Sequence, residues 1–152
     1  MIQPDWEQLV LDEIDSRSDE LLTLAGDLIR IPSENPSGDC TEVAAFVDGW
    51  LQSHNLPSTV LDAGDGRINV LSRFEDAAEA PERHLVLTGH YDVVPVGDVA
   101  RWSFPPFAGD VVDGFLRGRG ASDMKAGLAG AMLVHEVLHK LNVPTAGPVT
   151  FL

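Results

Sequence analysis

The sequence predicts an α/β fold in which helices flank a sheet of short strands, a three-layer α/β/α sandwich. The chain has 152 residues, of which 44% are apolar, enough to bury one core. Apolar residues recur at helical spacing in several segments. Short apolar runs of strand length lie between those segments. This order of helices and strands is typical of a layered α/β domain.

The N-terminal third predicts two helices. Residues 5–30 carry apolar side chains on one helical face and acidic ones on the other, and Pro32 ends this helix. The following "PSENPSGD" is a loop. Asp39 or Ser37 can cap a second helix, which ends at Asn55. Both helices would cover the sheet with their apolar faces.

Short strands are predicted in the middle of the chain. They lie at residues 58–61, 68–74 and 84–89, and residues 75–83 form a polar connection. The last of these strands is apolar enough to be covered on both faces. In "VVDGFL" at 111–116, the Asp-Gly pair predicts a tight hairpin turn.

A long helix from about residue 123 to residue 142 comes next, and "GPVTFL" at 147–152 begins a further strand. No connection follows that strand. We therefore expect the sandwich to be incomplete at the C-terminus.

The charge limits the possible partners. There are 24 acidic residues against 10 basic ones, a net charge of −14. This argues against nucleic acid and against anionic membranes, because both are polyanions. Such a surface would suit high salt, where screening relieves its self-repulsion. The sequence has no apolar run of membrane-spanning length and no signal peptide, so a cytoplasmic location is expected.

Three residues are candidates for a metal site. His90 and Asp92 follow the predicted strand at 84–89, and the ends of such strands are where ligand sites gather. His90 could donate to a divalent metal while Asp92 fixes its tautomer through the other ring nitrogen. Asp123 stands at the start of the long helix, where it is either a helix cap or a ligand bridging two metals. Its neighbour Lys125 could screen its charge.

A competing motif lies at the other end of that helix. Residues 135–139 read "HEVLH", the H-E-x-x-H pattern of zincin metallopeptidases. The motif needs a third ligand, and no His, Asp or Glu follows His139. From Asp123 to His135 the helix rises about 18 Å, so these residues cannot share one metal. A simpler explanation is that both histidines lie near the C-terminal end of the helix, where partial positive charge is favoured.

Several motifs together resemble one family. "LIRIPSENPSG", "GHYDVVPVGD" and "VVDGFLRGRGASDMKAG", in this order and spacing, are similar to the M20 metallopeptidase and deacylase family. The residues around His90 and Gly118 are most similar to its acetylornithine deacetylase and succinyl-diaminopimelate desuccinylase branch. The resemblance spans residues 20–152 and implies the zinc-peptidase type of α/β/α sandwich.

The resemblance also implies a function. These enzymes use two zinc ions, or cobalt in some members, to hydrolyse the amide bond of N-acyl amino acids or small peptides. Carried over, His90 is a terminal metal ligand, Asp92 the catalytic residue that orients its ring, and Asp123 the bridging ligand. The Asp123–Met124 peptide bond is then expected to be cis. The implied full-length protein is a homodimer.

The family's Glu-Glu pair, which supplies the general base and a ligand, has no counterpart after Asp123. Residues 1–152 would thus be the N-terminal part of a catalytic domain. The remaining catalytic segment and the lid and dimerisation domain are absent, and we expect no turnover by this chain unaided. Two alternatives stay open: a non-catalytic fragment or pseudo-enzyme module, and the zincin.

Overall fold

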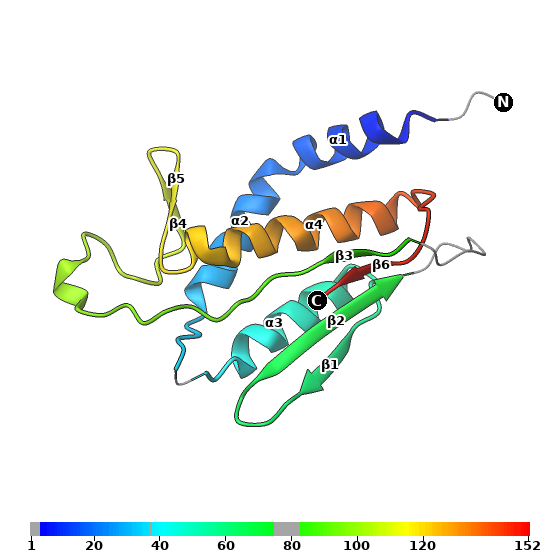
Figure 1. Cartoon of the computed structure of the whole chain (residues 1–152). Helices are drawn as coiled ribbons and strands as arrows, with labels where there is room; N and C mark the ends of the chain where they lie inside the picture. The colour runs from blue at the N-terminus through cyan, green and yellow to red at the C-terminus, as the bar shows by residue number, and fades with distance from the viewer. Residues whose placement is uncertain (1–3, 37, 75–82) are drawn as a thin grey trace.

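The computed structural model describes residues 4–36, 38–74 and 83–152. Within these residues, three α-helices come first, followed by five strands, a fourth α-helix and a sixth strand (Figure 1). In order they are α1 (Trp6–Ser16), α2 (Ser18–Arg30), α3 (Thr41–Ser53), β1 (Thr59–Asp62), β2 (Ile68–Phe74), β3 (Leu85–Leu87), β4 (Asp110–Val112), β5 (Phe115–Arg117), α4 (Ala126–Lys140) and β6 (Val149–Phe151). The predicted α/β class is confirmed.

The predicted first helix is two helices in the structure. The break falls at Arg17, whose backbone is not helical (φ −112°, ψ 22°). Ser16 and Ser18 flank it, and their hydroxyls donate to the carbonyls of Glu13 and Asp15. Such local bonds compete with the helical ladder, so a helix tends to end there.

The predicted second helix is α3. Its first turn is held by Asp39, whose Oδ1 accepts the backbone N–H of Thr41 at 3.0 Å. Cys40 takes the cap position without a side-chain bond of its own. Ser37, the other predicted cap, lies outside the described residues, as does most of the polar connection at 75–83.

The main sheet has the strand order β1-β2-β6-β3. β2 is antiparallel to both β1 and β6, whereas β3 and β6 are parallel. A separate hairpin, β4–β5, turns at Asp113 and Gly114, which both have positive φ (52° and 79°). This confirms the predicted tight turn, because only such a backbone closes a two-residue hairpin of this kind.

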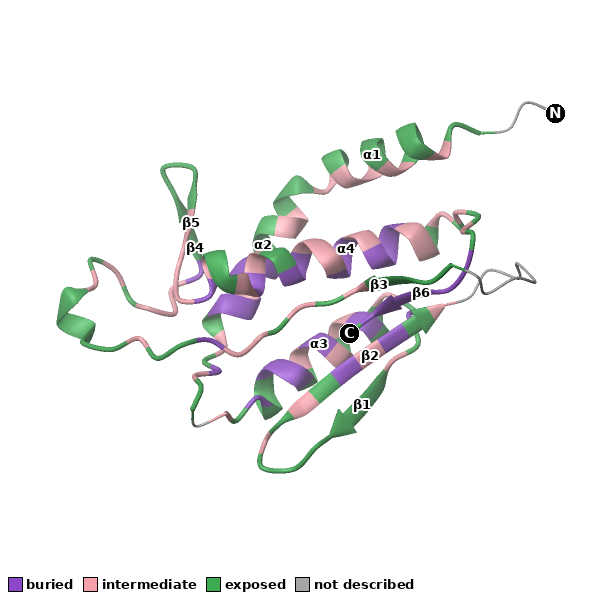
Figure 2. Cartoon of the chain, in the orientation of Figure 1, coloured by how far each residue is buried: buried purple, intermediate pink, exposed green. Residues whose placement is uncertain are grey.

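Helices cover one face of the sheet. Alternate residues Val70 and Ser72 of β2 are buried, and Ser72 bonds His135 of α4. Asn69 and Arg73 point to the opposite face and are exposed. One core joins α2, α3 and α4 to this sheet (Figure 2). The described residues thus supply two of the three predicted layers.

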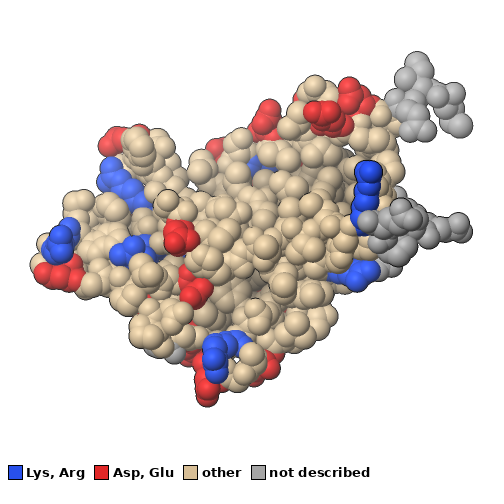
Figure 3. All heavy atoms as spheres, in the orientation of Figure 1, with Lys and Arg blue, Asp and Glu red and all other residues tan. Residues whose placement is uncertain are grey.

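β3 differs from its prediction. Leu85 and Val86 are 49% and 46% exposed, so the strand is not covered on both faces. It lies at an edge of the sheet, with β6 as its partner. The side of the molecule seen in Figure 3 has a largely uncharged middle, with basic and acidic groups toward the margins and two acidic groups left of centre. None of the helices formed by the described residues has the length and apolar character needed to span a bilayer.

The predicted long helix begins later than expected. α4 starts at Ala126, and an irregular turn, Ala121–Lys125, precedes it. Within this turn Asp123 has φ −136° and ψ 97°. The cap position of α4 is Lys125, so Asp123 is not the cap of this helix. The Asp123–Met124 peptide bond is cis, as the family resemblance predicted.

Candidate metal centre

The structure brings His90 and Asp123 together. His90 lies in the loop after β3, and Asp123 lies in the turn before α4. His90 Nε2 is 3.0 Å from Asp123 Oδ1. The side chains are 48% and 80% exposed, so solvent reaches both. The two donors come from segments 33 residues apart in sequence.

Asp92 contacts the other ring nitrogen. His90 Nδ1 is 3.0 Å from the backbone oxygen of Asp92 and 3.1 Å from its Oδ1. Burial lowers the pKa of His90, but the bond to the Asp92 carbonyl and the contacts with both carboxylates raise it above its ordinary value. The contacts of Asp92 with Nδ1 therefore fix the orientation of the His90 ring, so that Nε2 faces Asp123.

Asn35 contacts the candidate site through Asp92, and the sequence did not indicate this contact. Its Nδ2 donates to Asp92 Oδ2 at 3.0 Å. Its backbone N–H bonds the carbonyl of Val93, and the N–H of Val93 bonds the carbonyl of Ser33. The loop after α2 thus runs beside the loop that carries Asp92. The only sequence signal was the family-like "PSENPSG" motif itself.

Tyr91 fixes the same loop from the other side. Its hydroxyl donates to the carbonyl of Ile68 at the start of β2. Its own carbonyl accepts a hydrogen bond from the buried Ser33 Oγ at 2.5 Å. Burial raises the pKa of Tyr91 to about 12, so its hydroxyl stays protonated and remains a donor. His90 and Asp92 therefore stand on either side of an anchored residue.

Lys125 does not screen Asp123. Its side chain is fully buried, and Nζ donates to the carbonyls of Leu28 and Ile31 at 2.8 and 2.6 Å. Burial lowers the pKa of Lys125 to about 8. The lysine points to the end of α2 rather than to the candidate site. The sequence could not show this, because the acceptors are backbone atoms nearly a hundred residues away.

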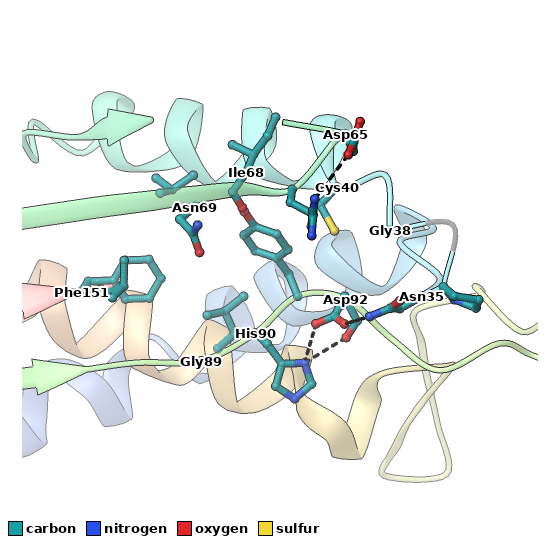
Figure 4. Close-up of a pocket in the computed structure, with 16 residues that line it drawn as sticks. Asn35, Gly38, Cys40, Asp65, Ile68, Asn69, Gly89, His90, Asp92 and Phe151 are labelled. Atoms are coloured by element: carbon teal, nitrogen blue, oxygen red, sulfur yellow. Dashed lines mark hydrogen bonds and ion pairs between the residues drawn. The ribbon is translucent and has the colours of Figure 1, made fainter. Parts of the chain in front are cut away.

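A cavity of about 520 Å³ opens beside His90 and Asp92. Figure 4 shows it between the loop after β3 and the start of β2, with Asn69, Cys40 and Phe151 on its walls. Its size is within the range of small-molecule sites. Burial, with help from nearby carboxylates, raises the pKa of Cys40, which fits an unreactive thiol.

The residues of the H-E-x-x-H motif form packing contacts and an ion pair within the protein. His135 is fully buried, bonds Ser72 at 2.9 Å, and its ring lies tilted against that of Phe74 with the centroids 4.9 Å apart. Glu136 forms an ion pair with Arg17, which ties α4 to the N-terminal helices. His139 also contacts the Phe74 ring. The structure therefore assigns this motif to packing and gives no support to a zincin site.

His90 and Asp123 fit part of a metal site. An imidazole nitrogen and a carboxylate oxygen are ligands that zinc and cobalt accept, and here they converge on exposed surface. Among the described residues, no group of three or more His, Cys, Asp or Glu side chains could hold a metal ion. The pair would therefore need donors from beyond these residues.

Comparison with known proteins places this geometry in context. Residues 86–152 match the family model described as peptidase family M20/M25/M40. A succinyl-diaminopimelate desuccinylase from Rhodospirillum centenum is 37% identical over 135 residues, which cover 86% of this chain and 33% of the relative. The chain thus spans about a third of the length of this curated relative.

Solved structures share the fold. Human carnosine dipeptidase 1 superimposes with a TM-score of 0.75 at 21% identity, over 99% of this chain and 34% of that protein. A dinuclear metal-binding M20 peptidase from Bacillus subtilis gives a TM-score of 0.60 at 19% identity, over 90% of this chain and 34% of that protein. At these identities the likeness concerns the fold alone.

Proposed function

Because the chain belongs to peptidase family M20/M25/M40, we propose that it is the N-terminal part of a metal-dependent hydrolase that cleaves amide bonds. The substrate class would be N-acyl amino acids or small peptides. This agrees with the similarity to a desuccinylase and with the fold shared with a dipeptidase. The remaining catalytic segment and a lid and dimerisation domain would be supplied by further chain, in a homodimer.

One observation carries the proposal: His90 Nε2 and Asp123 Oδ1 converge to 3.0 Å. We assign His90 as a terminal metal ligand, Asp123 as the ligand bridging two metals, and Asp92 as the catalytic residue that orients the His90 ring. Zinc is our first choice of metal and cobalt the second. The metal-binding M20 peptidase from Bacillus subtilis is described as dinuclear, in keeping with this assignment.

Two bound divalent ions would supply an activated water and polarise the amide carbonyl. The residues of this chain would hold and orient that site. The carbonyl and carboxylate of Asp92 hold the ring at Nδ1, which leaves Nε2 directed at Asp123. The neighbouring cavity of about 520 Å³ offers space for a small substrate next to this pair.

The general base is not assigned to any residue of this chain. Glu136, the acidic residue of α4, is paired with Arg17 and its side chain is 6% exposed. We therefore propose that residues 1–152 alone do not turn over substrate. The exposed edge of β3 and the largely uncharged middle of the open sheet face are where further catalytic segments would pack.

The test compares the complete protein that contains this chain with the 152-residue chain alone. Amine release from N-acetyl, N-succinyl and N-formyl amino acids and from dipeptides is measured with added Zn²⁺ or Co²⁺. We expect the complete protein to be active and to lose activity on His90→Ala or Asp123→Asn. A metal-loaded complete protein that hydrolyses none of these substrates would favour the pseudo-enzyme. Activity that survives His90→Ala would also overturn the proposal.

We further propose a cytoplasmic protein with neither nucleic acid nor membrane as partner. The support is the net charge of −14, which repels both polyanions. The same acidic excess would suit a protein that works at high salt.

A further inference from the structure

Lys125 occupies an unusual position for a lysine. It is fully buried, and no described carboxylate lies within ion-pair distance of its ammonium group. Burying a charge without compensation is costly, and an apolar side chain would fill the same volume without this cost. The position therefore calls for a reason beyond packing.

The partners of Lys125 are the carbonyls at the end of α2. Leu28 lies in the last turn of this helix and Ile31 follows it as the cap residue. The last carbonyls of a helix lack intrahelical partners and carry partial negative charge. The ammonium group of Lys125 donates hydrogen bonds to two of these carbonyls, and its positive charge faces the negative end of the helix. Lys125 thus fastens the turn Ala121–Lys125 to the end of α2.

The loop carrying His90 is fastened to the same segment. The N–H of Val93 bonds the carbonyl of Ser33, and the hydroxyl of Ser33 bonds the carbonyl of Tyr91. Residues 28–35, which we call the anchor segment, therefore hold both sides of the candidate site. One side is held through Ser33 and the other through Lys125.

The two sides also touch each other behind the site. A Cβ at Gly120, where φ is 90°, would lie 2.7 Å from Cγ1 of Val93 and 3.2 Å from Cδ of Lys125. The lysine stem is thus enclosed between the anchor segment and the turn. The backbone N–H of Lys125 also bonds the carbonyl of Gly120 at 2.7 Å, which closes the turn around Asp123.

We propose that Lys125 is a positioning residue that holds the turn bearing Asp123 against the anchor segment, so that the carboxylate stays within reach of His90. The role of Lys125 in metal binding rests on the proposed function. The anchoring of the turn by Lys125 does not, because it is a contact within the metal-free chain. Lys125 touches neither metal nor substrate in this account. It acts through Asp123.

The test uses Lys125→Met, which keeps the stem and removes the donor. Ser72→Ala is the matched control: it also removes a buried hydrogen bond to the long helix, but at the end away from Asp123. Lys125→Gln, a shorter side chain that retains a donor, serves if Lys125→Met does not fold. Amide hydrogen exchange of residues 119–126 is measured without metal, and Zn²⁺ affinity is measured on the complete protein.

We expect Lys125→Met to speed exchange in residues 119–126 by about 10-fold or more relative to the middle of α4. Zn²⁺ affinity should fall by about 10- to 100-fold, as for other residues that orient metal ligands. Ser72→Ala should change neither, even if it lowers the thermal midpoint equally. Lys125→Gln should lie between Lys125→Met and the unaltered protein.

Unchanged exchange in residues 119–126, or metal affinity that falls no more than in Ser72→Ala, would overturn the proposal and leave Lys125 a packing residue. A complete protein that binds no Zn²⁺ at all would instead contradict the proposed function. The exchange measurement would still decide whether Lys125 anchors the turn.

Discussion

His90 Nε2 and Asp123 Oδ1 lie 3.0 Å apart, although one residue follows a strand and the other precedes a helix. Neither residue is positioned by its own element alone. Both loops are fastened to the segment that leaves α2, through Ser33 and Lys125. The candidate site is therefore a property of the packing between α2, β3 and α4, and changes in that packing should be measurable.

Asn35 should matter for metal binding more than for stability. It is exposed, but its Nδ2 holds Asp92 Oδ2 at 3.0 Å. We expect Asn35→Ala to weaken Zn²⁺ binding by the complete protein by about 10-fold, because the Asp92–His90 pair loses its support. Isothermal titration measures this. Asn69→Ala, which alters another residue lining the same cavity, is the control and should bind normally. Equal losses in both variants would argue for a general effect of the cavity.

Two glycines in helices should respond in opposite directions. A Cβ on Gly26 in α2 would lie 2.5 Å from the carbonyl oxygen of Gly109, whereas a Cβ on Gly49 in α3 meets nothing within 4 Å. We expect Gly26→Ala to lower the free energy of unfolding by about 1–3 kcal/mol through overpacking. Gly49→Ala should raise it by about 0.5–1 kcal/mol through helix propensity. Denaturant unfolding of both variants gives the comparison, and destabilisation by Gly49→Ala would contradict it.

Histidine 135 should make stability depend on pH. Burial, with a smaller contribution from His139, lowers the pKa of His135 from 6.5 to about 4. Between those values the unfolded chain binds a proton that the folded chain does not. Stability should therefore fall as the pH drops from about 6.5 towards 4, by up to about 1.4 kcal/mol per pH unit.

Urea unfolding at pH 7 and pH 5 tests this prediction. His135→Gln removes the titrating group, so its loss of stability between these two pH values should be smaller than that of the unaltered chain. An equal loss in both proteins would assign the acid sensitivity to the carboxylates instead.

The acidic surface predicts a salt response. With a net charge of −14, the folded chain repels itself at low ionic strength, and added salt screens this repulsion. We expect the thermal midpoint to rise between low and molar KCl. Equal or greater stability in low salt would contradict adaptation to a saline environment.

The sequence predicted those elements of the fold that depend on local chemistry. Periodicity located α3 and β2, and the Asp-Gly turn located the β4–β5 hairpin, because these features depend on local chemistry. Long-range contacts were less accessible. The break at Arg17 involves an ion pair with Glu136, and the burial of Lys125 depends on carbonyls of α2. The exposure of β3 depends on what covers the sheet edge, which its own apolar residues do not specify.

The candidate site divides in the same way. His90, Asp92 and Asp123 were candidates from their places after a strand and before a helix, and the family resemblance gave them roles. The structure brings them together. Asn35 and Lys125 were not assigned these roles, since their contacts form only once the chain has folded.

The most direct test of the account is where the metal binds. Co²⁺ is titrated into the complete protein and into its His90→Ala and His139→Ala variants, and the visible absorption of bound cobalt is followed. His139 is the better H-E-x-x-H comparison because it is less buried than His135. We predict that His90→Ala weakens binding by at least about 10-fold and changes the spectrum, whereas His139→Ala leaves both unchanged. Loss of binding in His139→Ala with normal binding in His90→Ala would contradict the account.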